Sequence, residues 1–191
     1  TDNEIDLLRH FVLSVESNSR TKELRRNLIA AILAYGCNIG PKEMSDSLEG
    51  VSVWEIEGAF DRYLTEDNLK AATIEVINAI SRMELVHVWG DGKRSSSDGV
   101  VFALPLRVLQ SEQSTRLRER GIVFYPTLSD QHSILFQQII PVRLREALYA
   151  LDALLQHDTE LDPRMNISDM HGATELIMAA GKMLGFELCP R

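Results

Sequence analysis

The chain has 191 residues, of which 45% are hydrophobic and 25% charged, a balance that excludes disordered and low-complexity classes. Its two cysteines, Cys37 and Cys189, exclude a disulfide framework and a four-ligand zinc site and favour a reducing cytoplasm. No apolar run approaches the roughly 20 residues that cross a membrane, and a net charge of −8 opposes nonspecific binding to DNA.

The first 82 residues carry apolar side chains at helical spacing. This spacing predicts five helices, over residues 5–15, 21–36, 41–50, 52–63 and 65–80. We expect Gly36 to end the second helix in a left-handed conformation, Pro41 to open the third and Ser52 to cap the fourth. Residues 1–83 are therefore predicted to form an all-helical region.

The sequence changes near Glu84, where polar, turn-rich segments at 90–92 and 95–99 precede a series of strands. We predict strands at 100–104, 121–128, 133–142, 164–168 and 186–189, and helices at 144–155 and 172–184. Pro126 places the second strand at an edge or at a bulge. Three successive strands and a helical crossover predict a meander with a parallel strand beside it, so residues 84–191 have the element order of a partial RNase H-like α/β fold with a mixed sheet.

Two aspartates stand at the ends of predicted strands. Asp98 enters the first strand of the meander, and Asp169 ends the strand after the crossover helix. If these strands are neighbours, we expect the two carboxylates within about 4 to 7 Å, where they need a shared cation or a proton. Magnesium prefers such oxygen ligands. The structural alternatives are a turn at Asp98, before Gly99, and a helix N-cap at Asp169, before Gly172.

Basic side chains that are candidates for contact with DNA phosphates fall in two clusters, Lys93 with Arg94, and Arg116 with Arg118 and Arg120. The alternative for both clusters is a solvated loop. His171 lies two residues from Asp169 and either contacts phosphate or makes a structural hydrogen bond.

The glycine block at 89–92 and the serine run at 95–99 resemble the region around the first catalytic aspartate in transposases of the Tn-three family, which serve replicative class II bacterial transposons. The resemblance continues in the same order through residues 34–40 upstream and 128–131, 145–155, 168–172, 184–186 and 189–191 downstream. It implies a DDE transposase with an RNase H-like catalytic domain. Its two metal-binding, catalytic aspartates map onto Asp98, rather than Asp91, and Asp169.

The activity implied by this resemblance is nicking of transposon ends and joining of the freed 3′-hydroxyl to target DNA, with two magnesium ions for which manganese can substitute. The family's third acid, a glutamate, lies further downstream, and Glu175 and Glu187 are too close to Asp169 to be that residue. We therefore interpret the chain as an internal or truncated fragment, inactive alone, of a bacterial cytoplasmic protein that binds DNA and self-associates. A nuclease of the same fold and a noncatalytic DNA-binding or assembly module are the alternatives.

Overall fold

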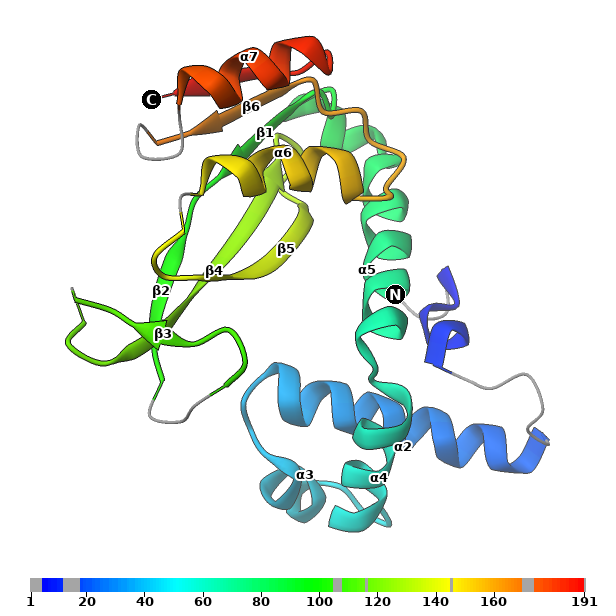
Figure 1. Cartoon of the computed structure of the whole chain (residues 1–191). Helices are drawn as coiled ribbons and strands as arrows, with labels where there is room; N and C mark the ends of the chain where they lie inside the picture. The colour runs from blue at the N-terminus through cyan, green and yellow to red at the C-terminus, as the bar shows by residue number, and fades with distance from the viewer. Residues whose placement is uncertain are drawn as a thin grey trace. The chain divides into compact units, whose positions relative to one another are not determined.

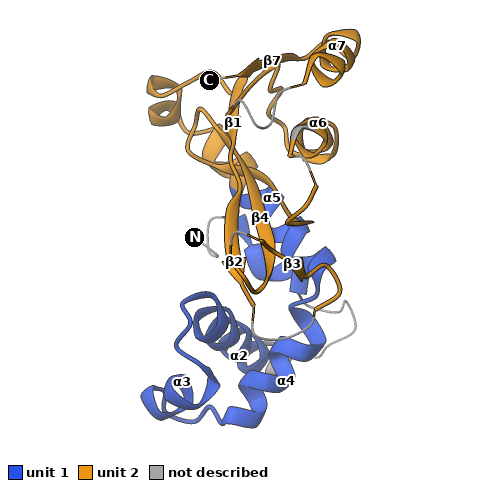
Figure 2. Ribbon diagram, turned by 60° about the vertical axis from the view of Figure 1, so that its left-hand side comes forward, with its two compact units in different colours: residues 1–76 blue, residues 77–191 orange. Residues whose placement is uncertain are grey.

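The computed structural model describes residues 5–11, 18–104, 108–115, 117–144, 146–169 and 174–190, without the side chains of 18–21 and 147. It divides the chain into two compact units, which we call the helical unit (residues 1–76) and the sheet unit (residues 77–191) (Figure 2). The division falls within helix α5 (Glu66–Ser81), upstream of the boundary predicted at residue 83. Within the described ranges, no helix has the length and apolar character needed to span a lipid bilayer.

The helical unit contains the predicted helices with one change of type. Its elements are η1 (Leu7–Phe11), α2 (Asn18–Gly36), α3 (Pro41–Ser47), α4 (Val53–Tyr63) and most of α5. The first element is a short 3-10 helix, whereas an α-helix was predicted over 5–15; residues 12–15 lie outside the described ranges. The left-handed residue after α2 is Asn38, with φ 54°, and Gly36 is instead the last helical residue.

The core of the helical unit lies between α2 and α4. Small residues of α2, Ala30, Ala31 and Ala34, are at most 1% exposed, which lets α4 pack closely with Ile56 at its centre. The rings of Tyr35 and Phe60 stack beside this core at a centroid distance of 3.8 Å. The amphipathic pattern alone therefore accounts for this unit.

Ser52 caps α4 through a reciprocal pair of hydrogen bonds. The backbone N–H of Glu55 donates to the Ser52 hydroxyl at 3.3 Å, and the backbone N–H of Ser52 donates to the Glu55 carboxylate at 2.8 Å. The bond from the Ser52 backbone, followed by the bond from its hydroxyl, holds the pKa of Glu55 below its usual value. The cap is therefore strongest when Glu55 is ionised.

We expect Ser52→Ala to lower the free energy of unfolding of the helical unit by about 1 kcal/mol at neutral pH. Because the folded-state pKa of Glu55 is lowered, its contribution is complete above the unfolded-state pKa and is lost as pH falls through the folded-state pKa. The difference between wild type and variant should therefore shrink as the pH falls through the lowered folded-state pKa of Glu55. Thermal unfolding followed by circular dichroism measures it. Ser47→Ala, which removes an exposed hydroxyl bonded within α3, is the control and should change little.

The sheet unit is built on seven strands. They are β1 (Arg94–Ser97), β2 (Val100–Ala103), β3 (Glu112–Gln113), β4 (Arg120–Ser129), β5 (Ile134–Pro141), β6 (Met165–Ser168) and β7 (Glu187–Pro190) (Figure 1). β4 pairs antiparallel with β1, β2, β3 and β5, while β6 pairs parallel with β1 and β7. β4 is not an edge strand, and the irregularity that Pro126 predicted is a register shift between Thr127 and Leu128.

β1 and β2 form one long strand that is interrupted at Asp98 and Gly99. Ser97 is opposite Thr127 of β4, and Val100 is opposite Phe124, so the register continues across the two unpaired residues without an offset. The prediction that 95–99 is a turn is wrong for residues 95–97, which form β1. Taking β1 and β2 as one strand, the order across the sheet is β5, β4, β1/β2, β6, β7. This order confirms the RNase H-like mixed sheet.

Helices α6 (Ala147–Gln156) and α7 (Glu175–Met183) lie on the same side of the sheet (Figure 2). Both crossovers join parallel strands and advance in the same direction, so the right-handed rule places both helices on one face. Ala150 of α6 packs against Val123, Tyr125 and Ile140 of the sheet. Leu151 of α6 packs with Ile177 of α7. The side chains of β4 that face these helices, at alternate positions from Gly121 to Ser129, are buried.

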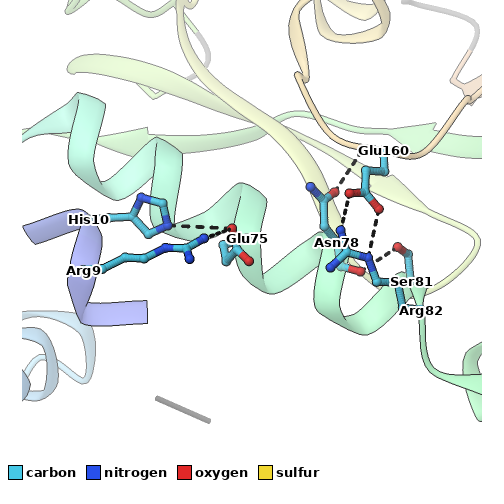
Figure 3. A network of polar contacts seen from close by, with 7 residues as sticks. All are labelled: Arg9, His10, Glu75, Asn78, Ser81, Arg82 and Glu160. Carbon is cyan, nitrogen blue, oxygen red and sulfur yellow. Dashed lines mark hydrogen bonds and ion pairs between the residues drawn. The ribbon is translucent and has the colours of Figure 1, made fainter. Parts of the chain in front are cut away.

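Polar contacts hold two segments against α5, each within one unit (Figure 3). In the helical unit, the Arg9 guanidinium binds the Glu75 carboxylate at 2.8 Å. In the sheet unit, the Arg82 guanidinium forms a forked ion pair with Glu160, whose backbone N–H donates to the Asn78 side chain at 2.8 Å. The second set fixes the loop that leads from α6 into β6.

Candidate active site

Asp98 and Asp169 follow two neighbouring parallel strands. Residues 94, 95 and 96 of β1 pair with residues 165, 166 and 167 of β6, so two further steps along this register bring Asp98 opposite Asp169. Neighbouring strands are about 4.8 Å apart, which places both aspartates at one point of the sheet. Both residues are exposed. The arrangement therefore presents two carboxylates to solvent from adjacent strand ends.

The structural alternatives for the two aspartates do not describe this fold. The cap of α7 is Thr174, whose hydroxyl accepts from the backbone N–H of Ile177 at 3.3 Å, so Asp169 does not cap that helix. Asp98 does not reverse the chain direction, because β1 and β2 follow the same partner strand on either side of it.

A layer of polar side chains lies beneath the two aspartates. Asn166 of β6 is completely buried, and its amide donates to the hydroxyls of Ser95 and Ser97 of β1, both at 2.9 Å. The Ser97 hydroxyl also lies 2.8 Å from that of Thr127 of β4. Since Ser97 immediately precedes Asp98, these bonds tie the position of Asp98 to the strand that carries Asp169. This layer could not be predicted from the sequence, because serine and asparagine are more typical of loops.

The buried phenol of Tyr125 lies close to this layer. Its side chain is 1% exposed, and its hydroxyl has no well-formed hydrogen bond among the described residues. Burial raises the pKa of Tyr125, the negative charge of Glu146 raises it further, and the charges of Asp169 and Asp98 add smaller contributions in the same direction, whereas the Ser97 hydroxyl opposes them. The charges of three carboxylates therefore raise the pKa of this one buried hydroxyl. No spacing in the sequence singles out Glu146, which precedes α6.

We expect Tyr125→Phe to leave the free energy of unfolding unchanged or to raise it by up to about 1 kcal/mol, because it removes a buried hydroxyl without a well-formed hydrogen bond. Thr127→Val is the matched contrast. It removes a buried hydroxyl that has a partner, and it should cost about 1–2 kcal/mol. Denaturant unfolding of both variants measures the difference, and equal losses in the two would show that the Tyr125 hydroxyl is well bonded.

Three described residues of the two basic clusters, Lys93, Arg94 and Arg120, lie away from the aspartates along their strands or are engaged elsewhere. Arg94 begins β1, four residues or about 13 Å along the strand from Asp98. Lys93 is beside it and lies 3.7 Å from the carboxylate of Asp91. The guanidinium of Arg120, at the start of β4, binds the hydroxyl and the backbone carbonyl of Ser111.

Two further candidates for phosphate contact lie outside the described residues. These are Arg116 and His171. Arg118, the middle residue of the second basic cluster, is exposed and has a φ of 57°. The side chain of Arg118 is therefore available to a ligand, whereas that of Arg120 is engaged within the fold.

The chemistry of Asp98 and Asp169 fits a hard divalent cation. Magnesium takes oxygen ligands and commonly uses only one or two protein carboxylates, leaving the other positions for water and phosphate. Among the described residues, no group of three acidic, histidine or cysteine side chains is close enough to hold a metal ion by itself. The donor set therefore suits a cation that is shared with a substrate or with further ligands.

Comparison with known proteins shows the family of the chain. The model of the family described as Tn3 transposase DDE domain matches residues 1–191. The transposase for transposon Tn2501 of Escherichia coli is 34% identical to this chain over 192 residues. The transposase for transposon gamma-delta of Escherichia coli (strain K12) is 28% identical over 193 residues. Both alignments cover 100% of this chain, which spans only 19% of the length of either relative. The Mos1 transposase paired-end complex with left transposon end is 12% identical with a TM-score of 0.37, covering 97% of this chain and 71% of that one.

Proposed function

Because the chain belongs to the Tn3 transposase DDE domain family, we propose that Asp98 and Asp169 are two of the metal-binding catalytic residues of a replicative transposase. The observation that carries the proposal is their position at adjoining ends of the parallel strands β1 and β6. We propose magnesium as the cation, with manganese as a substitute. The domain that bears the two aspartates is proposed to begin near residue 84 and to follow a helical region formed by residues 1–83.

The reaction proposed for the whole protein is cleavage at transposon ends followed by joining of the freed 3′-hydroxyl to target DNA. Cations held by Asp98 and Asp169 would supply positive charge to the attacking and leaving oxygens of the phosphate in such a displacement. The proposed role of Asp98 and Asp169 is to hold the cations at one fixed point of the sheet. The buried bonds from Asn166 to Ser95 and Ser97 keep the two carboxylates in register.

The contact with DNA is proposed to extend along the sheet away from the aspartates. Lys93, Arg94 and Arg118 are exposed and would bind phosphates, while Arg116, Arg120 and His171 remain candidates from the sequence. Because the net charge is −8, these contacts are too few to capture DNA tightly. We propose that DNA capture, self-association and the third carboxylate are supplied by parts of the cytoplasmic transposase other than this chain, which would be inactive alone.

The test is a strand-transfer reaction with the complete transposase, DNA that carries transposon ends, and magnesium, manganese or no metal. Metal-dependent cleavage and joining would support the proposal. Cleavage without joining would favour the nuclease alternative. DNA binding without either reaction, under conditions where a related transposase is active, would favour the assembly module and contradict the catalytic role of Asp98 and Asp169.

A further inference from the structure

Glu146 places a third carboxylate against the segment that carries Asp98. The residue immediately precedes α6, the helix that crosses from β5 to β6. A Cβ atom added to Gly99 would lie 2.5 Å from the Oε1 atom of Glu146 and 2.8 Å from its Cδ. The carboxylate therefore occupies the space directly over the residue that follows Asp98. Only glycine at position 99 leaves room for it in this arrangement.

The phenol of Tyr125 gives a second, independent sign that this point of the sheet is polar. A side chain that is 1% exposed would normally form a hydrogen bond through its hydroxyl, and this one has no well-formed bond among the described residues. The charge of Glu146 acts on this hydroxyl more strongly than do the charges of Asp169 and Asp98. Carboxylates from three separate segments of the chain thus raise the pKa of one buried group.

Like charges that are gathered in this way favour a cation between them. Coulomb attraction between a divalent ion and a carboxylate extends beyond direct contact, and groups that do not touch a metal still tune its affinity through bound water. Glu146 does not complete a three-ligand group with the two aspartates, because the described residues contain no such group. Its action on a cation at Asp98 and Asp169 therefore passes through water.

We propose that Glu146 is a positioning residue for the divalent cation, which it strengthens by accepting hydrogen bonds from the water molecules around that ion. The inference rests on the proposed function of Asp98 and Asp169. Glu146 is distinct from the downstream glutamate that the resemblance implies, and it would raise metal affinity without being a ligand. A side chain at position 99 would have to displace the Glu146 carboxylate and would also press on Val123, whose Cγ1 would lie 2.8 Å from its Cβ.

The experiment is a manganese titration of the complete transposase, followed by electron paramagnetic resonance of free Mn²⁺. We expect Glu146→Gln, which keeps the shape and removes the charge, to weaken Mn²⁺ binding by about 10-fold or more. Glu146→Asp, which keeps the charge, should lie between wild type and Glu146→Gln. Asp152→Asn removes one charge from the same helix, where its carboxylate accepts from Gln156, and should bind as wild type does. A thermal melt checks that each variant is folded.

Glu146→Gln should also raise the Mn²⁺ concentration needed for half-maximal activity by a larger factor than it lowers the activity at saturating Mn²⁺. A folded Glu146→Gln that binds Mn²⁺ within twofold of wild type, while Asp98→Asn does not bind, would overturn the role of Glu146 alone. Wild-type binding by Asp98→Asn and Asp169→Asn would overturn the proposed function itself. If Glu146→Gln does not fold, wild-type affinity in Glu146→Asp together with wild-type affinity in Gly99→Ala, which displaces the carboxylate, would overturn the inference.

Discussion

Replacing Asp98 or Asp169 by asparagine should lower metal-dependent strand transfer by the complete transposase by at least about three orders of magnitude, equivalent to about 4 kcal/mol in the activation free energy. The reason is that phosphoryl transfer depends on the placement of charge, and an amide cannot replace a carboxylate as a ligand of a hard cation. Asp91→Asn is the matched control. Asp91 is in the same glycine- and serine-rich block, but its carboxylate accepts from the backbone N–H of Lys93 and should not matter for the reaction.

The melting temperatures of alanine variants at the same two positions distinguish a catalytic role of the aspartates from a structural one. Without metal, neighbouring carboxylates repel, so we expect Asp98→Ala and Asp169→Ala to keep or slightly raise the melting temperature at neutral pH. With magnesium, the wild type should gain stability that neither variant gains, because the cation binds only the folded state. A large drop in melting temperature in both variants without metal would show that the two aspartates are structural caps.

Asn166→Ala should cost the sheet unit about 2–4 kcal/mol in free energy of unfolding. The substitution removes two buried hydrogen bonds, leaves a cavity in a fully packed position and deprives Ser95 and Ser97 of a donor. Since Asn166 joins β6 to β1, the same change should loosen the pairing that brings Asp98 opposite Asp169. We therefore expect weaker Mn²⁺ binding in the variant even under conditions where it is folded.

The matched control for Asn166 is Ser96→Ala. Ser96 lies between Ser95 and Ser97 but is exposed, and its substitution should change stability by less than about 0.5 kcal/mol. Denaturant unfolding followed by the fluorescence of Trp89, in a background of Trp54→Phe, reports on the sheet unit alone, because Trp54 belongs to the helical unit. A loss in Asn166→Ala no greater than that in Ser96→Ala would contradict the importance of the buried polar layer.

The helical unit and most strands of the sheet could be predicted from the sequence because their signals are local. The period of apolar residues marks α2 and α4. Ser52 marks the start of α4 through bonds to a residue within one turn, and Pro41 marks the start of α3 through its fixed φ. The first strand could not be predicted in this way. Ser95 and Ser97 face a polar layer, so β1 lacks the alternation of apolar and polar residues by which strands are identified.

The same difference between local and long-range information decides which residues of the candidate site could be predicted from the sequence. Asp98 and Asp169 can be identified from the sequence because each adjoins a predicted strand, which is a local property. The closeness of Glu146 to Gly99 depends on how the α6 crossover returns over the sheet, and no spacing in the sequence contains that information. The one available signal was the glycine after Asp98, which shows that a close approach is needed but not which group makes it.

The parallel pairing of β1 with β6 has a consequence for synthesis of the protein. Asn166 and the hydroxyl of Ser95 that it binds are 71 positions apart, whereas the β4–β5 hairpin closes through a short turn. Contacts of large sequence separation form slowly, and at about 5–20 residues per second a ribosome needs roughly 4–14 s to add the intervening chain. Throughout that interval Asp98 is exposed on the nascent chain without Asp169 beside it. The proposed cation site thus arises only after β6 has been made and docked, so an unfinished chain carries no assembled centre for cutting DNA.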